Sequence, residues 1–281
     1  MAYLMIFVPL FIGGITAIIP SNRFRPVLIP CAGIVHFCMT LNVLLKPDLI
    51  VNSNWLMLDP PGKIILLLVS TLYLFCSFYA VPYLMYRKER ENRVFSVCMI
   101  TFLSALSLVT WSQHLGLMWV AIEATTLITA PLIYYNRTQL SIEATWKYLL
   151  IGSVGIAMAL LGTFFMAYAS LHAGLEPTLN YANLVKNASS LSKIWLHLAF
   201  VLLMVGYGTK MGLVPMHTWK PDAYGESPGV VGAIFAGGIT SCAFLALLRI
   251  YHICTAANET AYTSKLLIFM GFFSMAVAAL F

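Results

Sequence analysis

Long apolar runs separated by short polar loops dominate the sequence, and most of these runs are close to the length of a membrane span. A helix of about 20 residues crosses a hydrocarbon core of about 30 Å. Only 9% of the residues are charged and 60% are hydrophobic, whereas about a quarter of a soluble domain is charged. The chain is therefore predicted to be an all-α, polytopic transmembrane bundle of about nine spans. The expected spans are residues 2–19, 27–45, 63–85, 94–111, 113–134, 145–170, 193–218 and 229–253, and a ninth that begins near Ser264 and is still apolar at Phe281.

Positive charges lie mostly in the loops between these runs, as the positive-inside rule describes for membrane proteins. The net charge of +6 is therefore no argument for a nucleic-acid partner. Nine Lys and Arg residues follow odd-numbered spans and five follow even-numbered ones. This bias predicts that the N-terminus lies outside and that residues 87–93 form a solvated cytoplasmic loop. The expected location is the inner (plasma) membrane of a cell, with the lipid bilayer around the chain.

The sequence contains no motif for a metal, a cofactor or a nucleotide. Its six cysteines form no CxxC pair, and its six histidines show no paired helical spacing. There is no HExxH and no P-loop pattern, and the glycines near residue 210 do not follow a strand. We expect no cofactor, no metal and no catalytic site in this chain.

The most informative stretch is GYGTKMGLVPMHTWKPDAYGESPG at 206–229, which places Lys210 inside an apolar run. Glycines stand on both sides of this lysine, and Pro215 follows five residues later. A charge at membrane depth is costly unless it faces water or a partner. Irregular backbone at that depth persists only where it is buried in protein or lines a wet cavity. The stretch predicts a discontinuous seventh helix with an ion or proton site, although a snorkelling lysine is the alternative.

A carboxylate, Glu123, stands near the middle of the fifth span. Burial disfavours the charged form of a lysine, whereas a nearby carboxylate favours it. If Glu123 approaches Lys210, the pair holds a proton on the lysine, and separating the two releases it. The alternative interpretation is a static buried ion pair that keeps two helices in register.

Other polar residues are candidates for proton relay or proton uptake. His217 follows Lys210 by seven residues, which is two turns along one helical face if the helix continues. Glu143 and Lys147 stand four apart with the acid first, so they are either a salt bridge or part of a proton path. The eighth span has no Lys or His between Gly229 and Leu248, and its nearest polar side chains are those of Thr240 and Ser241. The remaining candidates are Thr240, Ser241, Asp222 and Arg249.

Two segments carry a family resemblance. Residues 117–170 include MWVAIEATTLITAPLIYY and EATWKYLLIGSVGIAMALLGTFF, and residues 206–253 include the stretch around Lys210. Both resemble the antiporter-like proton-translocating subunits of respiratory complex I, Mrp antiporters and energy-converting hydrogenases, and look most like the F component of hydrogenase 4. The resemblance covers residues 95–255. It implies that Glu123 is the family's fifth-span glutamate and that Lys210 is its half-channel lysine. It also matches His217, Trp219, Pro221 and Asp222 to the segment that follows that lysine.

The sequence departs from this family at three places. Relatives commonly carry a Lys or a His in the eighth span, an apolar residue where Lys220 stands and often a His where Tyr224 stands. The family fold, about fourteen helices with two inverted five-helix repeats, is also longer than this chain. The resemblance implies three leading helices and a cytoplasmic loop in 1–93, the first repeat in 94–253 and the start of a ninth helix in 254–281. It predicts a partial chain, or one that a companion protein completes.

The resemblance implies a proton-translocating subunit of a redox-driven complex. The expected partners are other membrane subunits, among them a further antiporter-like subunit and a redox module. Two alternative classes remain open. One is a membrane subunit of an Mrp-type cation/proton antiporter or of a proton-coupled inorganic-carbon uptake complex. The other is a purely structural helical subunit.

Overall fold

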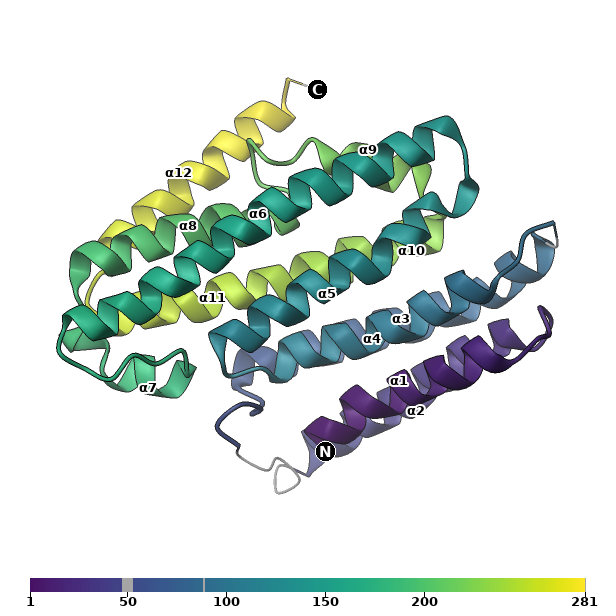
Figure 1. Cartoon of the computed structure of the whole chain (residues 1–281), viewed down its shortest axis with the longest axis horizontal. Helices are drawn as coiled ribbons and strands as arrows, with labels where there is room; N and C mark the ends of the chain where they lie inside the picture. The colour runs from purple at the N-terminus through teal and green to yellow at the C-terminus, as the bar shows by residue number, and fades with distance from the viewer. Residues whose placement is uncertain (47–52, 88, 281) are drawn as a thin grey trace.

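The protein is an elongated bundle of roughly antiparallel helices, seen here in a computed structural model that describes residues 1–46, 53–87 and 89–280 (Figure 1). Within these residues eight helices are long and apolar enough to span a membrane, and α1 is a shorter apolar helix. The predicted all-α polytopic fold is confirmed. The elements are α1 (Ala2–Ile18), α2 (Arg25–Leu45), α3 (Pro60–Tyr86), α4 (Arg93–Trp111), α5 (Leu115–Ile133), η2 (Tyr134–Asn136), α6 (Gln139–His172), α7 (Tyr181–Lys186), η3 (Ala188–Ser190), α8 (Lys193–Met211), α9 (Trp219–Glu226), α10 (Gly229–Ile234), η4 (Phe235–Ile239), α11 (Thr240–Ala256) and α12 (Thr260–Ala278).

Hydrogen bonds join the loops into two groups at opposite ends of the bundle. At one end, which we call the odd end, the loops after α1, α3 and α5 and the segment around α9 are linked. At the other, the even end, residues 53–59, 112–114 and 178–181 are linked. The odd-end bonds are Asn92 Nδ2 to Asn22 O at 2.7 Å, Arg90 Nη1 to Tyr135 O at 2.7 Å and Asn136 Nδ2 to Glu226 O at 2.8 Å. The even-end bonds are Gln113 N to Trp55 O and Tyr181 N to Gln113 O, both 2.8 Å.

The central helices pack closely because small residues face one another across α6 and α8. A Cβ added at Gly155 would lie 2.6 Å from Thr209 Cβ, and one at Gly206 would lie 2.6 Å from Ala159 Cβ. Small residues allow membrane helices to approach at backbone distance. This approach brings the C-terminal turn of α8, with Lys210, directly against α6.

The seventh span is interrupted, as the sequence predicts, but earlier than expected. Helix α8 ends at Met211, and Gly212 has φ +82, the left-handed conformation that glycine adopts readily. Leu213 N donates to Gly208 O at 2.8 Å and Gly212 N to Thr209 O at 3.1 Å, which is a Schellman ending. The expectation of a span reaching residue 218 was therefore wrong, because the chain leaves the helix at this glycine.

Side chains from α9 donate hydrogen bonds to backbone carbonyls in the last turn of α8, where the helix is interrupted. Trp219 Nε1 donates to Thr209 O at 2.9 Å, and Lys220 Nζ donates to Met211 O at 2.8 Å. Lys220, unusual for the family it resembles, thus has a local structural partner. Burial lowers the pKa of this lysine.

The eighth span also contains an irregular turn, which the sequence did not predict. The span consists of α10, the π-helical turn η4 and α11, which follow one another without a break and together are long enough to cross a membrane. Single π turns inside α-helices are frequent at functional sites. Phe235, the first residue of this turn, is fully buried next to Tyr148 of α6, with ring centroids 5.9 Å apart.

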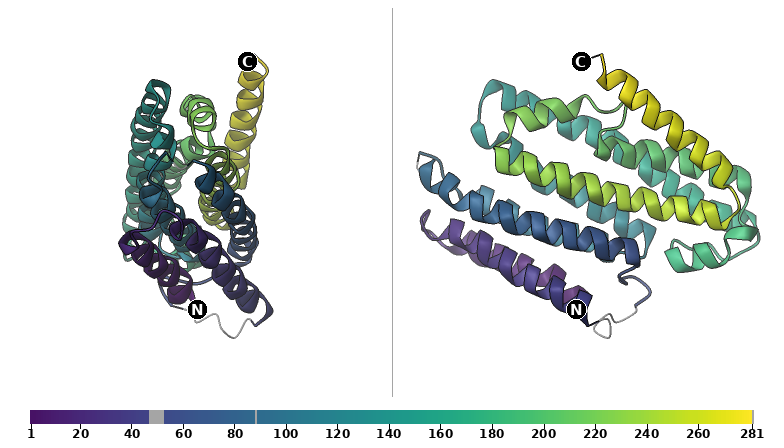
Figure 2. Two further views of the ribbon diagram at one scale, coloured as in Figure 1. Left: turned by 90° about the vertical axis from the view of Figure 1, so that its right-hand side faces the viewer. Right: turned by 180° about the vertical axis from the view of Figure 1, so that it is seen from behind.

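The apolar core lies between α4, α5, α6, α8 and α11, whereas α12 at one edge of the bundle is exposed. In the most apolar window of α4, 72% of the residues are buried, against 6% in α12. Figures 1 and 2 show α1 and α2 at one edge of the bundle and α12 at the other. The helices that carry Glu123 and Lys210 therefore belong to the central, well-packed part of the molecule.

Candidate functional site

Lys210 is enclosed by protein in the last turn of α8, and only 1% of its surface is exposed. Its ammonium lies against Gly152 of α6, where a Cβ would come within 2.8 Å of Nζ. Gly152 is thirteen residues into α6, or about 20 Å from the odd end of a helix about 50 Å long. The side chain does not extend to the molecular surface, unlike a snorkelling lysine. Glycine at position 152 makes the space for the ammonium.

The ammonium has a hydroxyl as its nearest partner and a carboxylate slightly farther away. Lys210 Nζ donates a hydrogen bond to Thr126 Oγ1, and it lies 5.5 Å from the centroid of the Tyr148 ring. Glu123 Oε2 is 3.9 Å from Nζ, which is too long for a hydrogen bond. That oxygen is buried and has no hydrogen-bond partner in the described part of the chain. Glu123 and Lys210 are therefore adjacent but not hydrogen-bonded.

Thr126 follows Glu123 by three residues on α5, so both side chains lie on one helical face toward Lys210. The ammonium thus has two alternative partners one turn apart. A neighbouring hydroxyl cluster supports the site, because Tyr148 OH and Thr129 Oγ1 share a 2.7 Å hydrogen bond. Tyr148 also packs against Trp219, with ring centroids 5.1 Å apart. Trp219 of α9, which follows the interruption of the seventh span, therefore helps to build the wall of the site.

Sequence reasoning missed Thr126, Tyr148 and Gly152 as parts of this site. Threonines at 125, 126 and 129 are the one available signal, because three hydroxyls within two turns of an apolar helix need partners inside the bundle. Nothing in the sequence separates Gly152 from the other glycines of α6.

His217 does not lie on a continuation of α8. The geometric argument for it was wrong, since the helix ends six residues earlier at Met211. Its Nδ1 lies 3.3 Å from Pro215 O within the same loop. A relay role for His217 stays a prediction that rests on the family resemblance.

Glu143 and Lys147 form the expected salt bridge, and Asp222 joins it. Lys147 Nζ is 2.7 Å from Glu143 Oε1 and 2.8 Å from Asp222 Oδ2. The three side chains are 40–58% exposed, so each pair contributes about 0–1 kcal/mol to stability. The cluster connects α6 to α9 at the odd end. A role in proton uptake remains a prediction for all three residues.

Arg249 is held in a buried clamp at the even end. It is 1% exposed, and its Nη2 lies 2.6 Å from Asp59 Oδ1 while its Nε lies 3.0 Å from Asp59 Oδ2. The same guanidinium donates to the carbonyls of Val109, Thr110 and Ser112. Asp59 also accepts from Gly62 N at 3.1 Å and caps α3. Sequence reasoning did not identify Asp59 as the partner, and a relay role for Arg249 is untested.

Thr240 and Ser241 begin α11 directly after the π-helical turn. Thr240 Oγ1 donates to Phe235 O at 3.4 Å, which follows from the irregular hydrogen bonding of that turn. Both residues are partly buried. Their role in carrying a proton onward from Lys210 stays a prediction.

Among the residues that the structure describes, no three His, Cys, Asp or Glu side chains converge as a metal site would require. The arrangement around Lys210 instead offers proton chemistry, because a lysine with two alternative partners can hold or release a proton.

Comparison with known proteins identifies the family. The profile described as "NADH:quinone oxidoreductase/Mrp antiporter, TM" matches residues 112–281. The chain belongs to this family. The resemblance stated from the sequence is confirmed, and this antiporter-like chain is an integral membrane protein with several spans.

Individual relatives agree with this assignment. The hydrogenase-4 component F homolog of Methylacidiphilum infernorum (isolate V4) is 32% identical over 271 residues, which cover 93% of this chain and 56% of that protein. The chain spans about half the length of the curated relatives that it matches.

Solved structures share the fold of this antiporter-like chain. A chain of respiratory complex I from Thermus thermophilus with bound aureothin has a TM-score of 0.75 at 23% identity, over 89% of this chain and 53% of that chain. A chain of the membrane-bound sulfane sulfur reductase, an archaeal respiratory membrane complex, has a TM-score of 0.78 at 19% identity, over 96% of this chain and 56% of that one.

Proposed function

We propose that this chain moves protons through the membrane by a half-channel centred on Glu123 and Lys210. One observation carries the proposal. An enclosed lysine on an interrupted helix donates to Thr126 while a carboxylate without a hydrogen-bond partner lies 3.9 Å away. Ionisable residues inside the membrane typically mark ion or proton pathways.

The two partners of Lys210 suggest how the site works. When Glu123 moves close, the carboxylate stabilises the charged ammonium and the proton stays on Lys210. When Glu123 moves away, or another positive charge approaches, the buried ammonium loses this stabilisation and releases its proton. Thr126 holds the side chain in place between these two states. A shift of about 1 Å separates the observed distance from a hydrogen-bonded ion pair.

We infer that the movement of Glu123 is driven from outside this chain, by a redox module and a further antiporter-like subunit in the same complex. Support comes from the named relatives, which include a hydrogenase-4 component F homolog and a subunit of F(420)H(2) dehydrogenase. We infer that the odd end faces the cytoplasm of a bacterial or archaeal cell, because its loops carry more Lys and Arg than the even-end loops.

A cation/proton antiporter subunit is the second candidate, because the family description names Mrp antiporters beside NADH:quinone oxidoreductase. Proton transport assays in reconstituted vesicles distinguish the two functions. A Na⁺ gradient across proteoliposomes moves protons through an antiporter, whereas a redox-driven subunit carries protons under voltage alone without Na⁺.

Lys210→Met tests the proposal directly. The full chain is reconstituted in vesicles, a K⁺/valinomycin voltage is applied and proton uptake is followed with an internal pH dye. We expect Lys210→Met to reduce uptake at least about a hundredfold, since the methionine side chain cannot carry a proton. Lys186→Met is the matched control, because Lys186 lies exposed on α7. Equal uptake by both variants would leave only a structural role.

A further inference from the structure

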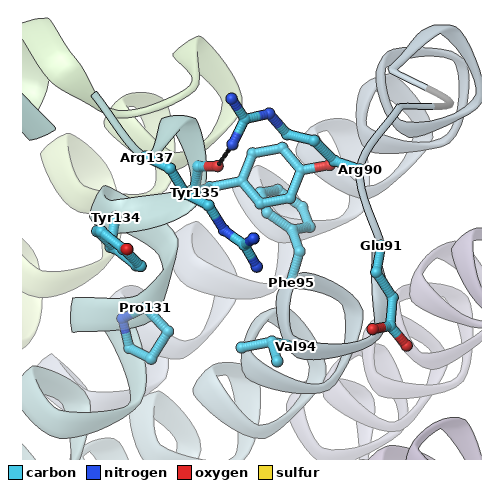
Figure 3. Close-up of a pocket in the computed structure, with 8 residues that line it drawn as sticks. All are labelled: Arg90, Glu91, Val94, Phe95, Pro131, Tyr134, Tyr135 and Arg137. Atoms are coloured by element: carbon cyan, nitrogen blue, oxygen red, sulfur yellow. Dashed lines mark hydrogen bonds between the residues drawn. The ribbon is translucent and has the colours of Figure 1, made fainter.

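A small basic cavity lies at the odd end, between the start of α4 and the end of α5 (Figure 3). Its volume is about 180 Å³. Arg90 and Arg137 supply its charge, and Val94, Tyr134 and Tyr135 are among its apolar and aromatic walls. This cavity is separate from the Glu123/Lys210 site and has no part in the proposed proton path.

Both arginines have N–H groups that make no hydrogen bond within the described part of the chain. Arg90 Nη1 donates to Tyr135 O at 2.7 Å, which fixes the side chain, but its buried Nε has no acceptor in the described part of the chain. Arg137 makes no side-chain hydrogen bond or ion pair with the residues described here, and Figure 3 shows its guanidinium pointing into the cavity. Its backbone has φ +52, a left-handed conformation that is unusual for arginine.

Among the residues that the structure describes, Glu91 is the single acid that lines the cavity, and its carboxylate is paired elsewhere. Its Oε1 lies 3.6 Å from Arg25 Nη1 and 3.4 Å from Arg93 Nε, neither of which lines the cavity. Figure 3 shows the Glu91 carboxylate turned away from Arg137. The cavity therefore keeps an excess of positive charge and has room for an anion.

An exposed apolar stripe leads from the cavity along α5 toward the middle of the bundle. Val120, Leu127 and Tyr134 follow one another at intervals of seven residues, so they share one face of the helix. They are 49%, 61% and 41% exposed, and Tyr134 lines the cavity. A soluble anion has no apolar surface that could pack against this stripe, whereas the acyl chain of a lipid would cover it. Basic pockets between membrane helices suit phosphate headgroups in general.

We propose that this cavity binds the phosphate of an anionic phospholipid, with an acyl chain along the Val120–Leu127–Tyr134 face of α5. Arg137 donates to the phosphate oxygens, a charge-assisted contact that guanidinium groups make well, and the positive charge of Arg90 in the cavity wall adds to the attraction. The aromatic ring of Tyr134 lies at the junction of headgroup and chain, where aromatic residues are common.

The test measures lipid binding to the purified full chain by native mass spectrometry, with phosphatidylglycerol and phosphatidylcholine as probes. Arg137→Gln should weaken phosphatidylglycerol binding about fivefold, Arg90→Gln by a similar factor and the double variant about 25-fold. Arg23→Gln is the matched control, because Arg23 is an exposed arginine of the odd end that does not line the cavity. It should change binding less than about twofold.

Because Arg90 also fixes Tyr135, its variant is checked for unfolding temperature, and Arg137→Gln carries the test alone if Arg90→Gln does not fold. Equal losses for Arg23→Gln and Arg137→Gln would overturn the proposal in favour of general surface charge. Unchanged binding by Arg137→Gln would overturn it outright. Inorganic phosphate that displaces phosphatidylglycerol at equal concentration would identify a soluble anion instead. None of these outcomes bears on proton uptake at Lys210.

Discussion

Thr126→Val removes the hydroxyl that holds Lys210 away from Glu123 while it keeps the shape of the side chain. A hydrogen bond to a charged group is worth about 1.5–3 kcal/mol. Without it, the attraction of Glu123 decides where the ammonium lies. At an effective dielectric constant of about 20, shortening the 3.9 Å separation to about 2.8 Å strengthens that attraction by about 1.7 kcal/mol.

A tighter pair holds the proton more firmly. The lost hydrogen bond had also favoured the charged ammonium, by about 1 kcal/mol more than it favours the neutral amine, so about 0.7 kcal/mol of this gain remains. Since about 1.4 kcal/mol corresponds to a factor of ten, proton release from Lys210 should slow about threefold. The assay is voltage-driven proton uptake in vesicles. Thr125→Val is the control, because Thr125 is also buried on α5 but donates to Ile122 O at 2.6 Å rather than to the lysine. Uptake by Thr126→Val at or above the wild-type rate, or an equal loss in Thr125→Val, would refute this reasoning.

Further outcomes follow from the same contacts. Gly152→Ala should displace the ammonium and reduce proton uptake about tenfold, whereas Gly271→Ala, which has nothing within 4 Å, should leave it unchanged. Asp59→Asn should lower the unfolding free energy in detergent by about 3–5 kcal/mol because it leaves Arg249 buried without a counter-charge, and Lys147→Met by less than about 1 kcal/mol because its bridge is exposed. Hydrogen bonds from Lys193 and His197 lower the pKa of Glu259 below its ordinary 4.5. The stabilisation that ionised Glu259 gives the folded protein is therefore complete above about pH 4.5 and is lost as the pH falls through the lowered pKa. Thermal unfolding should therefore depend on pH in this acidic range more strongly in the wild type than in Glu259→Gln.

Features that depend on local sequence were predictable. The spans follow from apolar length, and the interruption after Lys210 follows from the glycines and the proline around it. The prediction failed only in where the helix ends, because several residues between 206 and 215 could have stopped it. Gly212 does so by adopting a positive φ, and this choice is tied to packing against α9.

Features that depend on distant partners were not predictable from one sequence. Thr126 and Lys210 are 84 residues apart, and Asp59 and Arg249 are 190 apart. The first pair is decided by the packing of α5, α6 and α8 and the second by the packing of α3 and α11. A charge in an apolar run indicates only that some partner exists. The π-helical turn in the eighth span was also not predictable from local sequence, since its glycines at 237 and 238 are equally compatible with a regular helix.

The central claim is that Glu123 and Lys210 act as one unit in proton transfer. A double-mutant cycle measures this most directly, with proton uptake compared in Glu123→Gln, Lys210→Met and the double variant. If the carboxylate acts only through the lysine, the double variant transports no worse than Lys210→Met alone. If the two losses instead multiply as independent effects, Glu123 does not control the proton on Lys210, and the account is contradicted.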